Sequence, residues 1–124
     1  MRVLLVDDEE EFVSTLAERL SLRDIEADWV TTGRDALEIC ERVSYDIAVL
    51  DVKIPRISGI ELKRRLQEKC PDMKFIFMTG HGSEANFEEG AAETGDKFYL
   101  VKPVRIETLI ERIKEALQER GKGA

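Results

Sequence analysis

The chain has 124 residues, of which 43% are hydrophobic and 36% are charged, and its formal net charge is −7. This length and composition predict one globular domain, residues 1–120, followed by a tail or the start of a linker at residues 121–124. The negative charge argues against direct nucleic-acid binding, because affinity for a polyanion depends on clustered lysine and arginine. No stretch has the roughly 18 apolar residues of a membrane span, so we expect no membrane contact and a cytoplasmic location.

The first predicted strand, Val3–Val6, is wholly apolar and ends at Asp7 and Asp8. Asp8 is expected to cap the helix that follows, whose apolar face recurs at i, i+4 spacing over residues 12–20. The acidic residues 9–11 are expected to form the solvated first turn of this helix, where negative charge suits the helix dipole.

The central strand, residues 45–50, is a short apolar run with no breaker, which is typical of a strand buried on both faces. It ends abruptly at Asp51 and is followed by a loop through Pro55. Between the first and the central strand, residues 26–31 form a more polar strand that suits a sheet edge. Residues 32–35 match a capping box, which predicts a second helix.

The chain after Pro55 continues the same alternation. A capping box at residues 58–61 opens another helix, and the apolar strand 75–78 runs into Thr79. The pattern then weakens between Gly80 and Gly95, where the apolar face is thin and poor helix formers occur. We expect a helix there that is short, loosely packed or variable between states.

The last predicted strand, residues 98–101, runs into Lys102 and Pro103. A strongly amphipathic helix follows from Arg105 and is expected to stop at Gly121. In total, five strands alternating with five helices predict an α/β fold with a doubly wound, five-stranded parallel sheet.

Four of the strands end in polar residues that a core strand would not choose. If the strands are parallel, their carboxyl ends meet at one edge, the place where open α/β sheets bind ligands. That edge would hold three carboxylates, one hydroxyl and one ammonium: Asp7, Asp8, Asp51, Thr79 and Lys102.

This set of groups favours phosphoryl chemistry. Three clustered carboxylates repel one another unless a cation neutralises them, and Mg²⁺ suits such oxygen ligands, with Mn²⁺ expected to substitute. Lys102 and Thr79 would neutralise and hydrogen-bond a transferring phosphoryl group. Asp51 would then be the nucleophile, forming an acyl phosphate.

In this arrangement the chain resembles the receiver domain of two-component response regulators, from Val3 to about Arg120. Each matching piece is weak alone, but together, in this order and at strand ends, they are specific. The pieces are Asp7-Asp8, Asp51 with Pro55 and Gly59 after it, Thr79-Gly80-His81-Gly82, and Lys102-Pro103.

The resemblance implies a flavodoxin-like (CheY-like) sheet with strand order 2-1-3-4-5. It also implies a Mg²⁺ site formed by Asp7 or Asp8, Asp51 and the main-chain carbonyl of Lys53. By the same resemblance, the bond between Lys102 and Pro103 is expected to be cis.

The function implied by the resemblance is that of a signalling switch. Asp51 would accept phosphate from a sensor histidine kinase or a phosphotransfer protein, and the domain would catalyse only its own phosphorylation and dephosphorylation. Phosphorylation would draw Thr79 toward the phosphoryl group and turn Tyr99 inward, which remodels the face of residues 84–120 for an output domain or protein. A dimer that depends on phosphorylation is a further expectation.

Lys53, Gly80 and His81 occupy positions that flank the phosphoryl group in this family. Gly80 leaves room for phosphate, whereas Lys53 and His81 are large enough to hinder attacking water. We therefore expect a long-lived phosphorylated form, and small residues at both positions should speed its hydrolysis. The interval from Thr79 to Lys102 is one residue longer than is usual in the family.

Two other functions stay open from the sequence. One is a receiver-like interaction module that works without phosphorylation, although the whole chemical set is present. The other is a phosphohydrolase of the haloacid dehalogenase type, which places its nucleophile after the first strand in a DxD motif. Residues 7–10 here read Asp-Asp-Glu-Glu, which does not match that motif.

Overall fold

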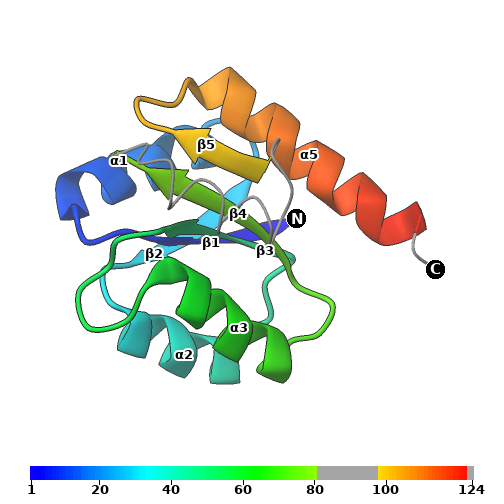
Figure 1. The fold of residues 1–124 in the computed structure, drawn as a ribbon. Helices are drawn as coiled ribbons and strands as arrows, with labels where there is room; N and C mark the ends of the chain where they lie inside the picture. Colours follow the sequence, from blue (N-terminus) through cyan, green and yellow to red (C-terminus); the bar gives the residue numbers. More distant parts are fainter. Residues whose placement is uncertain (81–97, 123–124) are drawn as a thin grey trace.

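The structure, a computed structural model, describes residues 1–80 and 98–122. These residues form one sheet of five parallel strands in the order β2-β1-β3-β4-β5, which confirms the predicted fold (Figure 1). The strands are β1 (Arg2–Val6), β2 (Glu26–Val30), β3 (Ile47–Asp51), β4 (Lys74–Thr79) and β5 (Tyr99–Val101).

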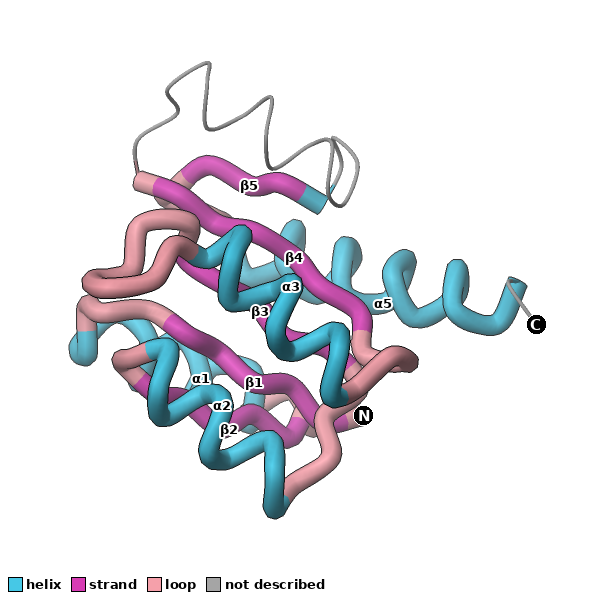
Figure 2. Tube along the Cα trace, turned by 60° about the horizontal axis from the view of Figure 1, so that its bottom comes forward, coloured by secondary structure: helices cyan, strands magenta, loops and turns pink. Residues whose placement is uncertain are grey.

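The described helices cover both faces of the sheet. They are α1 (Glu10–Ser21), α2 (Gly33–Arg42), α3 (Gly59–Lys69) and α5 (Ile106–Lys122). α1 and α5 pack on one face, and α2 and α3 pack on the other (Figures 1 and 2). The helix expected between Gly80 and Gly95 falls within residues 81–97, outside the described residues. None of the described helices is long and apolar enough to cross a membrane.

Strand alternation explains why the apolar runs are continuous. Successive side chains of a strand point to opposite faces. In β1, Val3 and Leu5 join the hydrophobic layer beneath α1 and α5, whereas Leu4 and Val6 join the layer beneath α2 and α3. Both faces of the central strands are therefore buried, and their polar residues are confined to the strand ends.

The predicted capping residues are correct for two helices and wrong for one. Thr32 Oγ1 accepts the Asp35 N–H at 3.0 Å, and Ser58 Oγ accepts the Glu61 N–H at 3.1 Å. Asp8 does not cap α1, because Glu9 occupies the N-cap position and its side chain makes no capping bond.

The last helix is longer than predicted. α5 continues through Lys122, so Gly121 does not stop it. A glycine near a helix end costs only about 1 kcal/mol relative to alanine, and the amphipathic turns before it outweigh this cost.

Candidate functional site

The carboxyl ends of β1 and β3 bring three carboxylates together. These strands are parallel neighbours, with Val6 paired to Leu50, so the residues that follow them meet at the same edge. Oxygen atoms of Asp7, Asp8 and Asp51 all lie within 4.8 Å of one another. Three oxygen donors at this spacing fit a hard divalent cation such as Mg²⁺.

The two most buried carboxylates each use one oxygen to accept a backbone hydrogen bond. Asp7 Oδ1 accepts the Glu9 N–H at 2.9 Å, and Asp51 Oδ1 accepts the Lys53 N–H at 3.2 Å. The Asp7 bond ties the N-cap residue of α1 to the acidic edge without capping the helix. Because these bonds fix both carboxylates, their other oxygens are held facing the rest of the site.

Lys102 supplies the positive charge of the site. Its backbone N–H donates to the Thr79 carbonyl at 2.8 Å, which continues the pairing of β5 with β4. Its ammonium lies 2.6 Å from Asp7 Oδ2 and 3.6 Å from Asp51 Oδ2. The peptide bond from Lys102 to Pro103 is cis, as predicted.

Burial and charge act against each other on these groups. Burial, reinforced by the charge of Asp7, raises the pKa of Asp51, and the Lys102 ammonium and the Lys53 N–H only partly offset this. Burial disfavours the ammonium of Lys102, but its hydrogen bond to Asp7 and the charge of Asp51 outweigh burial and raise its pKa. Among the described residues, the Lys102 ammonium is therefore the charge that offsets the repulsion between these carboxylates.

The remaining predicted site residues differ in exposure. Thr79 is fully buried at the end of β4. Tyr99 is also buried, with its ring edge-on to Phe77 at a centroid distance of 6.1 Å. Lys53 and Gly80 are exposed beside the carboxylates and Thr79, respectively. His81 lies outside the described residues.

Sequence reasoning missed two neighbours of Lys102. Glu9 Oε1 lies 3.2 Å from the Lys102 ammonium, and the ring centroid of Phe12 lies 4.6 Å from it. The sequence assigned Glu9 to a solvated turn and Phe12 to the apolar face of a helix. Their position could have revealed this contact, because both residues lie at the start of the helix that follows the acidic end of the first strand.

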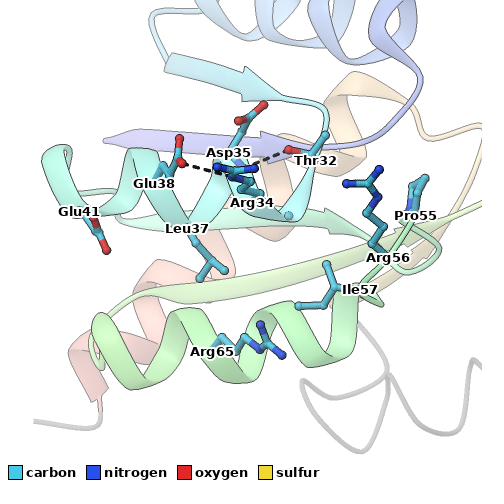
Figure 3. Close-up of a pocket in the computed structure, with 11 residues that line it drawn as sticks. Thr32, Arg34, Asp35, Leu37, Glu38, Glu41, Pro55, Arg56, Ile57 and Arg65 are labelled. Carbon is cyan, nitrogen blue, oxygen red and sulfur yellow. Dashed lines mark hydrogen bonds and ion pairs between the residues drawn. The ribbon is translucent and has the colours of Figure 1, made fainter.

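A separate pocket of about 980 Å³ lies between α2 and the loop after β3 (Figure 3). Its floor includes Leu37 and Ile57, and arginine side chains at its rim come from α2, the loop and α3. None of the carboxylates near Lys102 lines it. This pocket is therefore distinct from the acidic edge.

The raised pKa of Asp51 predicts that its charge destabilises the metal-free fold. Below the unfolded pKa of about 3.9 the penalty is absent, and it grows as pH rises through the higher folded pKa. Asp51→Asn is therefore expected to raise the free energy of unfolding by about 0.5–2 kcal/mol at pH 7, and by less at pH 4. Urea denaturation without divalent metal measures this, with the exposed Asp72→Asn as the control. A less stable Asp51→Asn protein at pH 7 would contradict it.

Comparison with known proteins identifies the family. The family model for the response regulator receiver domain matches residues 3–114. Response regulator MprA of Mycobacterium leprae is 33% identical over 95% of this chain and 51% of its own length. Regulatory protein LuxO of Vibrio cholerae is 31% identical over 95% of this chain and 26% of its own length. The chain thus spans about half or less of the relatives named here.

Solved structures show the same fold. A CheY-like receiver domain protein from Methanospirillum hungatei JF-1 superposes with a TM-score of 0.88 at 31% identity, covering 99% of this chain and 98% of that one. The beryllofluoride-activated NtrC4 receiver domain dimer gives 0.86 at 32% identity, covering 96% and 98%. With its matching sheet order and acidic edge, the chain belongs to the response regulator receiver domains, the phosphorylation-dependent switches of two-component signalling.

Proposed function

We propose that Asp51 is the phosphoacceptor of this receiver domain. The observation that carries the proposal is the convergence of Asp7, Asp8 and Asp51 on one edge with the Lys102 ammonium among them. An Asp51 oxygen attacks the phosphorus of the donor, and the bond from phosphorus to the leaving group breaks. The product is an acyl phosphate on Asp51.

The hydrogen bonds around Asp51 favour one of its two oxygens as the nucleophile. Oδ1 accepts the Lys53 N–H, whereas Oδ2 is the oxygen nearest the Lys102 ammonium. We assign the attack to Oδ2, because Lys102 can then neutralise charge on the transferring group. Thr79, buried at the end of the next strand, would donate its hydroxyl hydrogen to a phosphoryl oxygen.

The residues present fit a divalent cation. Asp7, Asp8 and Asp51, with the main-chain carbonyl of Lys53, would hold Mg²⁺ or Mn²⁺. When bound, the metal would neutralise negative charge on the phosphoryl oxygens. The buried, mutually repelling carboxylates support this, because a cation relieves the repulsion that burial intensifies.

The proposed partners follow from the family. The donor is a sensor histidine kinase or a phosphotransfer protein, and a small phosphorylated molecule can replace it in vitro. Catalysis is limited to the domain's own phosphorylation and dephosphorylation. A cytoplasmic location is part of the proposal, because the phosphoryl group of such donors comes from cytoplasmic ATP.

The proposed output is a change on the face of residues 84–120. Thr79 moves toward the phosphoryl group and Tyr99 adjusts with it, which shifts the population between two states of this face. Residues 84–97 of the face lie outside the described residues. The partner that responds to this change is an output domain or protein. The NtrC4 dimer, solved in its beryllofluoride-activated form, supports a phosphorylation-dependent dimer as one version of the output.

Incubation with acetyl phosphate and Mg²⁺ tests the phosphoacceptor. Intact-mass measurement is expected to show one added phosphate on the wild-type protein, lost in alkali as acyl phosphates are. Asp51→Asn should abolish it, whereas the exposed Asp72→Asn should retain it. No phosphate on the wild-type protein would favour a phosphorylation-independent module instead, and phosphate retained in Asp51→Asn would place the acceptor elsewhere.

A further inference from the structure

The Lys102 ammonium forms ion pairs with three carboxylates in this site. A lysine ammonium has three N–H donors. The carboxylate oxygens around it lie at 2.6 Å (Asp7), 3.2 Å (Glu9) and 3.6 Å (Asp51). Asp51, the proposed phosphoacceptor, is thus the most distant of the three. A phosphoryl group on Asp51 would therefore compete for the ammonium with Asp7 and Glu9, which both lie nearer to it than Asp51 does.

Of these contacts, the one with Glu9 has no part in the metal site. Asp7 belongs to the carboxylate cluster that fits a divalent cation, so bound metal would compete with Lys102 for it. Glu9 lies outside that cluster, and its carboxylate stays available to the ammonium when the metal site is filled. Phe12 adds a second attraction, because its ring centroid lies 4.6 Å from the same nitrogen.

We propose that Glu9 and Phe12 are positioning residues that hold Lys102 in a resting orientation, in competition with the phosphoryl group. This inference rests on the proposed role of Lys102 at Asp51. Both residues are well placed for it, because Glu9 is the N-cap residue of α1 and Phe12 lies in its first turn. The hydrogen bond from the Glu9 N–H to Asp7 Oδ1 joins this turn to the acidic edge.

The competition is expected to be weak enough for signalling to overcome. The Glu9 side chain is 65% exposed, whereas that of Lys102 is only 11% exposed. Ion pairs with one solvated partner are modest in strength, so releasing Lys102 from Glu9 should favour the phosphoryl state about two- to fivefold. Glu9 thus sets how readily the switch turns on without blocking it.

Glu9→Gln tests this by removing the charge while keeping the side-chain length. Beryllofluoride, a phosphoryl mimic, is titrated at saturating Mg²⁺ and followed by ¹⁹F NMR, and acetyl phosphate gives the initial phosphorylation rate. We expect beryllofluoride to bind about two- to fivefold more tightly, with a faster rate. Phe12→Leu removes the aromatic face but keeps an apolar side chain, and it should increase the affinity for beryllofluoride about twofold.

Glu10→Gln is the matched control. It removes the same charge one residue later, and Glu10 is exposed with no ion pair in the described part of the chain. The difference in beryllofluoride affinity between Glu9→Gln and Glu10→Gln should shrink as salt is raised toward about 0.5 M, because salt screens the partly exposed ion pair of Glu9 with Lys102. A purely structural effect of the substitution would not depend on salt in this way.

The outcomes separate this inference from the proposed function. If the wild-type protein binds beryllofluoride but Glu9→Gln and Glu10→Gln behave alike, the positioning role is wrong and the phosphoacceptor stands. If the folded wild-type protein binds no beryllofluoride and takes no phosphate, the proposed function is wrong and the inference with it. Equal thermal unfolding midpoints for the wild type, Glu9→Gln and Glu10→Gln would show that a difference in affinity does not come from a difference in folding.

Discussion

Lys102→Met is expected to lower the free energy of unfolding of the metal-free protein by about 3 kcal/mol at pH 7, because it leaves buried carboxylates without their cation. Asp7 is fully buried, and its Oδ2 lies 2.6 Å from the ammonium that the substitution removes. Methionine keeps the length and apolar stem of lysine, so the loss reports charge rather than packing. Urea unfolding in the presence of a chelator measures it.

Mg²⁺ should rescue this variant. A cation bound among Asp7, Asp8 and Asp51 neutralises the repulsion that the lost ammonium had compensated, and a ligand that binds only the folded state stabilises it. The rise in unfolding midpoint with Mg²⁺ is therefore expected to be larger for Lys102→Met than for the wild-type protein. Lys114→Met, at an exposed position of α5, is the control and should behave as the wild type. A variant as stable as the wild type without metal would refute the electrostatic account.

The outline of the fold and of the site was predictable because the apolar strands end abruptly at polar residues. A buried parallel strand reads as an apolar run, so a carboxylate at its end, such as Asp51 after β3, is conspicuous in the sequence. Parallel pairing then forces the strand ends to one edge. The meeting of Asp7, Asp51 and Lys102 follows from topology and does not require knowledge of any rotamer.

The partners of Lys102 could not be predicted in the same way. Residues 7–11 are five consecutive acids, and periodicity does not say which carboxylate turns toward a lysine 93 residues away from Glu9. That choice depends on side-chain rotamers and on the hydrogen bond that the Asp7 side chain accepts from the Glu9 N–H. Asp8 does not cap α1, because the helix begins one residue later than propensity predicts, with Glu9 at the N-cap position.

Gly59→Ala is expected to lower the free energy of unfolding by at least about 1–3 kcal/mol, because the added methyl group has no room. A Cβ at Gly59 would lie 2.2 Å from the backbone oxygen of Asp51 and 3.0 Å from Val52 Cα. The Gly59 N–H also donates to the Val52 carbonyl at 2.8 Å, so α3 begins directly against the backbone at Asp51 and Val52. Backbone cannot rotate aside as a side chain can, so either α3 or the end of β3 must move.

This clash should affect chemistry as well as stability, since a displaced Asp51 no longer meets Lys102 and the other carboxylates. Gly59→Ala is therefore expected to slow phosphorylation by acetyl phosphate and to weaken the stabilisation by Mg²⁺. Gly80→Ala is the matched control at the same edge, because within residues 1–80 and 98–122 its Cβ would meet only Lys102 Cδ at 3.9 Å, an ordinary contact. It should stay within about 0.5 kcal/mol of the wild type. If both glycine variants lose stability equally, the close approach of α3 to Asp51 is not what constrains this edge.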